Sequence, residues 1–262
     1  MIKGRCALVT GSVGGIGLAT VRALAAEGCN VVMNGFGDAD EIEALRGRIA
    51  AETGVKVVYH GADLSSREQI EGMIADVERE IGPVDILVNN AITRHYAPIE
   101  EFPTDRWEYA LAVNLSAPFH TIRLTMPHMK RQRWGRIINI ASNLGLTAVP
   151  NRVDYITTKH GIIGLTRAVA LEGLEAGVTC NAICPGSTLT PHAKRQLEAR
   201  ASAAGVSEDE VVQSFLAERQ PSRRFVLPED VAALIVFLCG DAAREMTGTP
   251  VSIDGGWLAA AS

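Results

Sequence analysis

The sequence predicts an α/β domain in which helices cover both faces of one parallel β-sheet. Three observations predict it. Short β-branched runs alternate with longer helical patterns, as in parallel strands joined by crossover helices. The runs at 86–88 and 137–138 are continuously apolar, which is typical of strands buried on both faces. A glycine-rich turn at 11–17 separates the first strand candidate from the first helical pattern, where phosphate-binding turns occur.

Strands and helices alternate regularly along the sequence, and the first strand leads into the glycine turn. We expect about seven strands, at residues 7–10, 30–34, 55–60, 86–89, 136–141, 178–183 and 250–253. The helical patterns between them cover residues 15–27, 39–52, 67–80, 104–131, 154–175 and 228–238. Right-handed crossovers then favour a doubly wound, Rossmann-like sheet. Because neither a repeat nor a low-complexity linker divides the chain, we expect residues 1–262 to form one domain.

Composition excludes several classes of protein. The chain is 47% hydrophobic and has a net charge of −5, which argues against disorder and against a nucleic-acid binder. The longest apolar run, 232–239, is far shorter than a membrane span, and the apolar stretch at 6–9 is too short for a secretory signal. The five cysteines are scattered without partners for a zinc site. We therefore expect a cytoplasmic protein with reduced thiols, no bound metal and no membrane or nucleic-acid partner.

Residues 187–227 break the alternation, because they contain no strand candidate. Ser207 and Glu210 form a capping-box pattern ahead of Val211 and Phe215, which predicts that a helix begins there. An insertion at the carboxyl end of a strand lies where ligands bind in such sheets. We interpret this segment as a helical lid over the substrate. The alternative is that it extends from the domain to pack against a neighbouring subunit.

The glycine turn and the end of the second strand predict a dinucleotide site. Glycines permit positive φ and close approach of the backbone, and the first N–H groups of the next helix attract phosphate. The second strand ends at Asn34, and the loop that follows contains no Arg or Lys to hold a 2′-phosphate, whereas Asp38 and Asp40 would repel one. NAD is therefore favoured over NADP, although the loop could also be only a turn.

Tyr155 and Lys159 form the candidate catalytic pair. They are four residues apart at the start of a helical pattern, so they share one face of the helix. The nearby ammonium of Lys159 would favour the phenolate form of Tyr155. The Tyr155 oxygen could then exchange a proton with an alcohol. Ser142, just past a strand, could bind the same oxygen. Asn114 lies in an apolar stretch of the helical pattern 104–131. Alternatively, Tyr155 and Lys159 lie on an exposed helix face, and Asn114 is a core amide whose hydrogen bonds are satisfied within the protein.

Taken together, these residues resemble the short-chain dehydrogenase/reductase family over almost the whole chain. The matching segments are Thr10-Gly11, Gly15-Ile16-Gly17, Asp63-Leu64, Asn89-Asn90-Ala91, Asn114, Ser142, Tyr155, Lys159 and Pro185-Gly186. The resemblance implies that Tyr155 is the general acid/base, that Lys159 binds the nicotinamide ribose, that Ser142 positions the substrate oxygen and that Asn114 holds a water in a proton relay. It further implies cofactor contacts at Gly11, Ser12, Gly15, Ile16, Gly17, Phe36, Asp63, Leu64, Asn90, Tyr155, Lys159, Pro185, Gly186, Thr188 and Thr190. Ile92 departs from the family's usual glycine, which predicts a different local backbone.

Several segments are similar to one branch of that family, the bacterial D-3-hydroxybutyrate dehydrogenases. They are residues 34–37, 97–103, 134–142, 159–161, 179–186, 246–249 and 254–257. The resemblance places the substrate at Arg94, Ser142, Leu144, Arg152, Tyr155, Gln196 and Trp257. Of the positions that bind the substrate's carboxylate in that branch, only Gln196 is retained; Arg94, Leu144 and Arg152 stand where the branch has Gln, His and Lys. Ser187 replaces a Trp. We expect a roomier and more positive pocket, still suited to an anion, unless both arginines are simply exposed.

The sequence therefore predicts an NAD-dependent oxidoreductase that interconverts a secondary alcohol and a ketone. D-3-Hydroxybutyrate and acetoacetate, or a related 3-hydroxy acid, are the expected substrates. One alternative is a short-chain dehydrogenase for a larger or cyclic alcohol; the other is a dinucleotide-binding sensor without turnover. The family resemblance also implies a homotetramer, with the helices 104–131 and 154–175 at one interface and the C-terminal segment near another.

Overall fold

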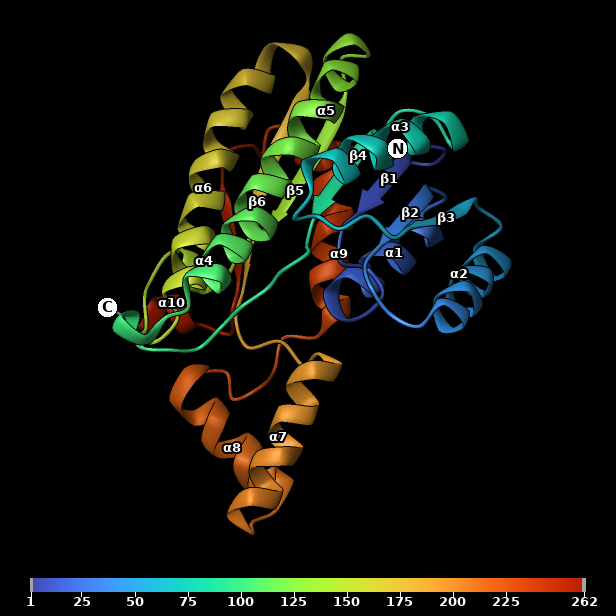
Figure 1. The fold of residues 1–262 in the computed structure, drawn as a ribbon. Helices are drawn as coiled ribbons and strands as arrows, with labels where there is room; N and C mark the ends of the chain where they lie inside the picture. The colour runs from blue at the N-terminus through green and yellow to red at the C-terminus, as the bar shows by residue number, and fades with distance from the viewer. Residues whose placement is uncertain (1, 261–262) are drawn as a thin grey trace.

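A parallel seven-stranded sheet forms the middle layer of the molecule (Figure 1). The structure, a computed structural model, describes residues 2–260. The strands are β1 (Cys6–Val9), β2 (Asn30–Asn34), β3 (Val57–His60), β4 (Ile86–Asn89), β5 (Gly135–Ile140), β6 (Val178–Pro185) and β7 (Pro250–Ile253). Their order, β3-β2-β1-β4-β5-β6-β7, reverses direction between β1 and β4. This reversal is the point at which ligands bind in doubly wound sheets, and it confirms the predicted fold class.

Three long helices cover each face of the sheet. One face carries α1 (Gly15–Ala26), α2 (Ala39–Thr53) and α9 (Pro228–Cys239), and the other carries α3 (Arg67–Glu80), α5 (Ala117–Arg131) and α6 (Val153–Gly173). The remaining α-helices are α4 (Thr104–Leu111), α7 (Pro191–Ala204), α8 (Glu208–Arg219) and α10 (Trp257–Ala260). Short 3₁₀ turns lie at Ile99–Glu101, Asn143–Gly145, Leu174–Ala176 and Asp241–Ala243.

Neighbouring side chains along each central strand enter opposite cores. Val9 and Ile138 pack among residues of α1, α2 and α9, whereas Leu8 and Ile137 pack among residues of α3, α5 and α6. All four are fully buried. Burial of each such side chain contributes roughly 1.5–3 kcal/mol, so the continuously apolar strands fix a sheet with helices on both faces.

Two helical segments differ from the prediction. The pattern at 104–131 does not form one α-helix, because a π-helical turn at Ala112–Ser116 separates α4 from α5; apolar periodicity cannot reveal a single widened turn. Helix α7 was not predicted. Thr190 caps it by accepting the N–H of Ala193, and Gly205 ends it with a φ of 65°. Helix α8 begins at the predicted capping box of Ser207 and Glu210.

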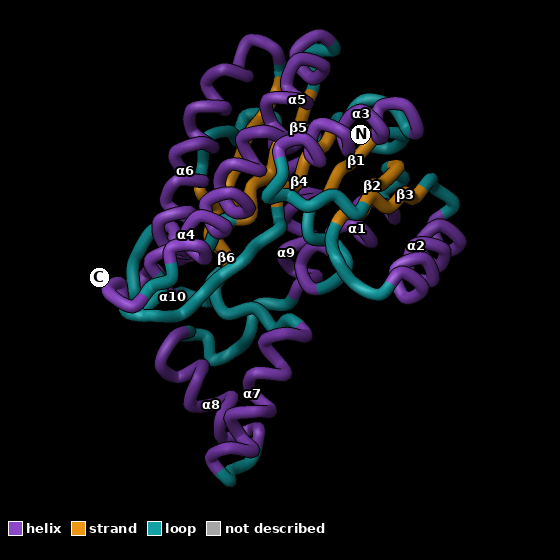
Figure 2. Tube along the Cα trace, in the orientation of Figure 1, coloured by secondary structure: helices purple, strands orange, loops and turns teal. Residues whose placement is uncertain are grey.

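Helices α7 and α8 extend beyond the sheet at the edge where the strands end (Figure 1). They follow the carboxyl end of β6, and loops connect them to the sheet on both sides (Figure 2). The chain therefore places two helices next to the ends of the strands, where the loops after β1, β2, β4 and β5 also lie. Within residues 2–260, no helix combines the length and the apolar character that crossing a membrane requires.

Candidate active site

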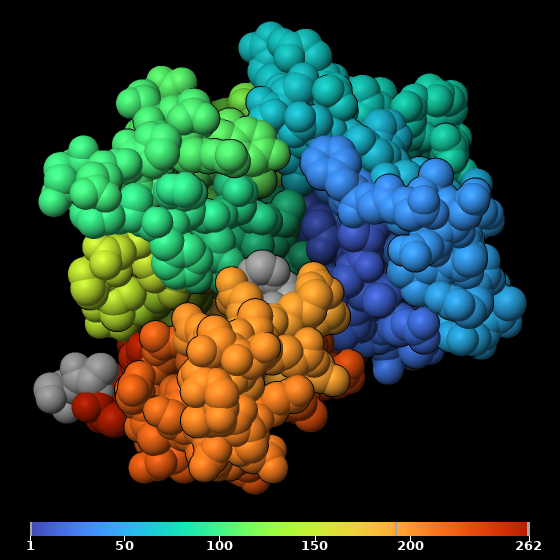
Figure 3. Space-filling view, turned by 60° about the horizontal axis from the view of Figure 1, so that its bottom comes forward, coloured from blue at the N-terminus to red at the C-terminus, as the bar shows by residue number. Residues whose placement is uncertain are grey.

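A cavity of about 1130 Å³ lies at the carboxyl edge of the sheet. Its walls come from the loops after β1, β2, β4, β5 and β6 and from α7 and α8. In the space-filling view, the orange segment that contains α7 lies across from the blue N-terminal part and the green segment around α4 (Figure 3). Ligand pockets commonly measure about 300–1,000 Å³, so this cavity has room for more than one small molecule.

The glycine turn is packed too tightly for side chains at two positions. A Cβ on Gly11, whose φ is +60°, would lie 2.7 Å from the Cα of Ala91. A Cβ on Gly17 would lie 2.4 Å from the Gly11 carbonyl oxygen and 2.6 Å from the Asn90 amide nitrogen. Close packing here brings the start of α1 against the loop after β4, and so shapes the wall of the cavity.

The start of α1 is suited to phosphate groups. Gly14 precedes the helix without a side-chain cap, and a Cβ there would meet nothing within 4 Å. The first N–H groups of α1 therefore face open space at the positive end of the helix. Thr190 lies beside this helix start, since its side chain would be 3.3 Å from a Cβ on Gly15. These residues form a cradle that fits a dinucleotide pyrophosphate.

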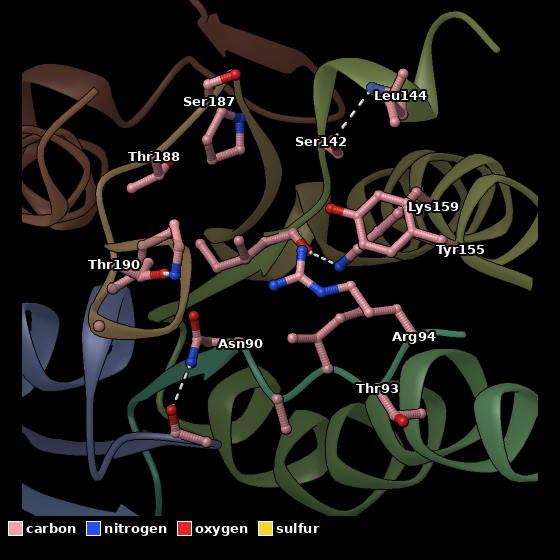
Figure 4. Close-up of a pocket in the computed structure, with 18 of the residues that line it drawn as sticks. Asn90, Thr93, Arg94, Ser142, Leu144, Tyr155, Lys159, Ser187, Thr188 and Thr190 are labelled. Atoms are coloured by element: carbon pink, nitrogen blue, oxygen red, sulfur yellow. Dashed lines mark hydrogen bonds between the residues drawn. The ribbon is translucent and has the colours of Figure 1, made fainter. Parts of the chain in front are cut away.

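Some predicted cofactor residues support the cradle instead of lining it. The Ser12 side chain is fully buried, and its hydroxyl accepts the N–H of Asn34 at 3.0 Å. Asn90 lines the cavity, but its amide donates to the carbonyls of Thr10 and Gly11 at 2.9 and 2.8 Å (Figure 4). Ser12 and Gly17 are outside the cavity wall, whereas Val13 and Gly14, which were not predicted, belong to it.

The end of the cavity beside β2 carries no cation. Its walls include Asn34, Gly35, Phe36, Ala62, Asp63 and Leu64. Asn34 is occupied by hydrogen bonds to the carbonyls of His60 and Ala62. Asp38 caps α2 by accepting the N–H groups of Asp40 and Glu41. The loop bends at Gly37 and leaves Phe36 61% exposed at the cavity.

Tyr155, Lys159 and Ser142 meet in the middle of the cavity (Figure 4). The Lys159 Nζ lies 5.6 Å from the centroid of the Tyr155 ring, and it donates a hydrogen bond to the carbonyl of Ile140 at 2.5 Å. Lys159 is only 4% exposed, so the pair does not belong to an exposed helix face. Burial, together with the nearby Arg94 guanidinium, lowers the pKa of Lys159 to about 7.

Ser142 is held by the 3₁₀ turn that follows β5. Its hydroxyl donates to the Asn143 side chain at 3.0 Å and accepts the N–H of Leu144 at 3.1 Å. The turn packs against α6 at Gly145, where a Cβ would lie 2.9 Å from the Lys159 carbonyl oxygen. Ser142 and Lys159 are therefore fixed relative to each other by backbone packing.

Asn114 lies in the π-helical turn and does not line the cavity. Its carbonyl oxygen accepts the N–H of Thr93 at 2.9 Å, and its amide donates to the Thr93 carbonyl at 2.8 Å and to the Thr158 hydroxyl at 3.4 Å. The side chain is thus a satisfied buried amide. It ties the segment that carries Arg94 to the helix that carries Lys159.

The predicted substrate residues line the same cavity as Tyr155. Arg94, Leu144, Arg152, Gln196 and Trp257 all line the cavity. The Arg152 guanidinium carbon lies 4.7 Å from the Tyr155 ring centroid and 4.9 Å from that of Tyr96. Its Nε is buried without a hydrogen-bond partner in the described chain. Arg152 is therefore half-buried among aromatic rings, with capacity left for a ligand.

The loop after β6 closes the cavity on the side of α7. The predicted residues Pro185, Gly186, Thr188 and Thr190 line it, together with Ser187. The buried Gln220, which was not predicted, accepts the N–H of Ser187 at 2.8 Å and so fixes this loop. Ile92 also lines the cavity, and its φ is not positive. A β-branched residue is therefore accommodated there without strain.

The cavity is strongly basic although the chain is acidic. Its wall contains Arg94, Arg152, Lys159, Arg195, Arg200 and Arg219, and the one acidic residue among its described lining is Asp63. Three of these, Arg195, Arg200 and Arg219, come from α7 and α8 and were not predicted. Arg200 follows Gln196 by four residues, so a prediction of α7 would have placed both on one face. No sequence pattern near Arg219 predicts that its side chain lines the cavity.

The fold and the site define a nicotinamide-dinucleotide-binding oxidoreductase. A family model described as short chain dehydrogenase matches residues 5–201. A D-beta-hydroxybutyrate dehydrogenase of Cupriavidus necator is 49% identical over 99% of this chain and 100% of its own length. Another of Rhizobium meliloti is 47% identical over 97% of this chain and 99% of its own. The chain belongs to the short-chain dehydrogenase family.

The solved structures agree with this assignment. L-sorbose reductase from Gluconobacter frateurii, complexed with NADPH and L-sorbose, superposes with a TM-score of 0.93 at 29% identity, over 98% of this chain and 97% of its own. Levodione reductase superposes with a TM-score of 0.88 at 30% identity, over 98% and 99%. Among the described residues, no group of three or more His, Cys, Asp or Glu side chains could hold a metal ion.

Proposed function

We propose that the protein is an NAD-dependent dehydrogenase that interconverts D-3-hydroxybutyrate, or a related 3-hydroxy acid, with its 3-keto acid. The observation that carries this proposal is that Tyr155, the buried Lys159 and two arginines, Arg94 and Arg152, line one cavity. The relatives named above, which align over nearly the whole chain, support the substrate class.

The proton chemistry belongs to Tyr155. In oxidation, Ser142 holds the substrate oxygen while the Tyr155 oxygen takes the hydroxyl proton; in reduction the proton returns. Because the pKa of Lys159 is about 7, both forms of its amine are populated near neutrality, and the amine can pass a proton beside Tyr155. When bound, the nicotinamide supplies the acceptor or donor of hydride. Asn114 acts as a positioning residue through the contacts of its side chain with Thr93 and Thr158.

Arg94, Arg152 and Gln196 hold the substrate's carboxylate. Arg152 lies directly beside the Tyr155 ring, so a carboxylate bound there leaves the neighbouring carbons of the acid next to the phenol. Its planar fork suits a carboxylate. Leu144 and Trp257 supply apolar walls. A 3-hydroxy acid places its hydroxyl at Ser142 and Tyr155 and its carboxylate at the arginines. A neutral alcohol leaves the charges of the arginines without a partner anion.

We favour NAD as cofactor, because the end of the cavity beside β2 contains Asp63 and lacks a cation in its described lining. A 2′-phosphate would find no positive partner there. The Gly14 cradle fits the shared pyrophosphate and does not discriminate between NAD and NADP.

The setting of the enzyme is also part of the proposal. Helices α7 and α8 act as the lid of the site, since both contribute arginines to its wall. The assembly is a homotetramer that uses α5, α6 and the 3₁₀ turn after α6, where Phe119, Leu171 and Leu174 are exposed. The five buried free cysteines suit a reducing, cytoplasmic setting.

The test is spectrophotometric reduction of NAD and NADP by both enantiomers of 3-hydroxybutyrate, with 2-butanol and cyclohexanol as neutral controls. We expect D-3-hydroxybutyrate with NAD to give a kcat/KM at least about 100-fold above that of either neutral alcohol. Saturation by neutral alcohols alone would favour a dehydrogenase for larger or cyclic alcohols. Dinucleotide binding without turnover of any secondary alcohol would indicate a sensor.

A further inference from the structure

Two arginines lie on the lid side of the cavity and have no role in the mechanism above. Arg200 comes from α7 and Arg219 from the end of α8, and both line the cavity that holds Tyr155 and Arg152. We call Arg200 and Arg219 the distal arginines. The Arg219 guanidinium carbon lies 4.4 Å from the Phe215 ring centroid, so an aromatic ring supports it on one side and leaves its fork available.

Neither distal arginine forms an ion pair with any residue between 2 and 260. Other arginines do so, among them Arg46 with Glu43 and Arg123 with Glu71. Arg200 and Arg219 also line a smaller cavity of about 300 Å³ between α7 and α8, which they share with Glu210 and Glu218. Neither of these carboxylates lines the main cavity, where Asp63 is the one acidic residue in the described lining. The distal arginines thus add positive charge to the main cavity without an ion-paired carboxylate in the described part of its wall.

The electrostatic cost of this arrangement is visible at Arg219. Partial burial, with smaller contributions from the like charges of Arg200 and Arg152, lowers the pKa of Arg219, while Glu218 opposes that shift. Cations that repel one another in a partly dry site are offset by a bound anion. The same repulsion links the distal arginines to Arg152 and therefore to the reaction centre.

The phosphates of the dinucleotide do not explain the distal arginines. The phosphate cradle faces Thr190, at the start of α7. Arg200 is ten residues further along that helix, which corresponds to about 15 Å at 1.5 Å per residue. Arg219, in contrast, interacts electrostatically with Arg200, Arg152 and Tyr96, and Arg152 contacts the rings of both Tyr96 and Tyr155. The distal arginines are therefore on the substrate side.

We infer that the site accepts a 3-hydroxy dicarboxylate: Arg94 and Arg152 hold one carboxylate, and Arg200 and Arg219 hold the other. This inference rests on the proposed function, and it narrows the substrate class to acids whose far end is anionic. The cavity volume of about 1130 Å³ leaves space for the longer acid beside the cofactor.

The experiment compares 3-hydroxyglutarate with the two enantiomers of its monomethyl ester, which has nearly the same length but lacks the second charge. With NAD and the wild-type enzyme, we expect kcat/KM for the diacid to exceed that for the better ester at least about tenfold. Arg219→Gln should remove most of this ratio. Lys194→Gln removes a charge from the exposed side of α7, where Lys194 is 66% exposed, and should leave the ratio unchanged.

Arg200→Gln is the second variant. It keeps the contact between Arg219 and Phe215, whose loss in Arg219→Gln could unfold the lid around residue 219. Equal rates with the diacid and the ester, or an equal loss with both in Arg200→Gln and Arg219→Gln, would overturn the inference. A raised KM for NAD in both variants, with the ratio intact, would assign the distal arginines to the cofactor and also overturn it. If 3-hydroxybutyrate is oxidised and the diacid is not preferred, the inference fails alone; if no hydroxy acid is oxidised, the proposed function fails with it.

Discussion

The ammonium of Lys159 is anchored to the backbone carbonyl of Ile140, the last residue of β5, at 2.5 Å. This bond joins helix α6 to the carboxyl end of the central strand, on which the catalytic geometry depends. It also holds the amine in a buried position, where the charged form is disfavoured. Because burial lowers the pKa of Lys159 to about 7, its protonation changes near neutral pH.

Replacing Lys159 by Met should stabilise the protein in the absence of cofactor. The folded-state pKa of about 7 is below the ordinary value of 10.5, so the unfolded chain binds more protons between these values and wild-type stability rises with pH across that window. At pH 6 we expect Lys159→Met to be more stable by about 2 kcal/mol or more, after loss of the Ile140 hydrogen bond. The advantage should shrink as the pH rises towards 10.

Chemical denaturation at several pH values measures this difference. Lys130→Met is the control, since Lys130 is exposed at the end of α5 and should give a difference that does not vary with pH. A Lys159→Met variant that is less stable than the wild type at pH 6 would contradict the prediction, because burial of the Lys159 amine would then not lower the stability of the wild type.

Replacing Tyr155 by Phe should abolish turnover without loss of cofactor binding. Removal of the phenol oxygen deprives the alcohol of its proton acceptor, a contribution of about 10²–10⁴-fold to the rate. Steady-state kinetics gives the loss, and quenching of protein fluorescence by NADH gives the binding. Tyr109→Phe deletes a phenol oxygen elsewhere in the cavity wall and should keep near wild-type activity. Turnover of Tyr155→Phe within about tenfold of the wild type would remove Tyr155 from the acid/base role.

The fold could be predicted from the sequence because its determinants are local and repeated. The central strands contain continuous apolar runs, as at Leu8 and Val9, and neighbouring side chains in these runs find a core on opposite faces of the sheet. The glycine turn was recognisable for the same reason, since Gly11 and Gly17 are required by direct backbone contacts. These sequence signals are local, even where the reason for one of them, as for Gly11 against Ala91, is contact with a distant segment.

The parts that escaped prediction depend on tertiary packing. The π-helical turn at Asn114 widens a helix whose apolar pattern is continuous, and the reason lies in the distant partners Thr93 and Thr158. Helix α7 had a cap at Thr190 and a stop at Gly205, so its omission was avoidable. The entry of Arg219 into the cavity follows from the way α8 folds back over the site, which no local pattern encodes.

Replacing Arg152 by Gln should weaken the use of hydroxy acids and spare neutral alcohols. The guanidinium beside Tyr155 would no longer offset the substrate's carboxylate, and we expect kcat/KM for D-3-hydroxybutyrate to fall at least about tenfold. Arg152→Lys should retain part of the activity, because it keeps the charge but not the fork. Arg106→Gln, at an exposed position on α4, is the matched control. A similar loss with 2-butanol would contradict a role in holding the carboxylate.

Replacing Leu171 by Arg should dissociate the proposed tetramer. Leu171 is 72% exposed on α6, near the exposed Leu174, and a charge there would be buried without a partner in the interface. Size-exclusion chromatography with light scattering measures the mass of the assembly. Leu227→Arg, at another exposed leucine outside α5 and α6, should leave the mass unchanged. A tetramer that persists in Leu171→Arg would move the interface away from this part of α6.

Replacing Gly14 by Val should separate cofactor binding from folding. Gly14 has an extended backbone with a φ of −168°, and a Cβ there would contact no protein atom within 4 Å, so the melting temperature should stay within about 2 °C of the wild type. The added side chain would instead project at the start of α1 and exclude a pyrophosphate, which should raise the Kd for NADH at least about tenfold. Gly11→Ala is the contrasting variant: its Cβ would collide with Ala91 at 2.7 Å, so it should lose thermal stability as well. Unchanged NADH affinity in Gly14→Val would mean that the phosphates bind elsewhere than at the start of α1.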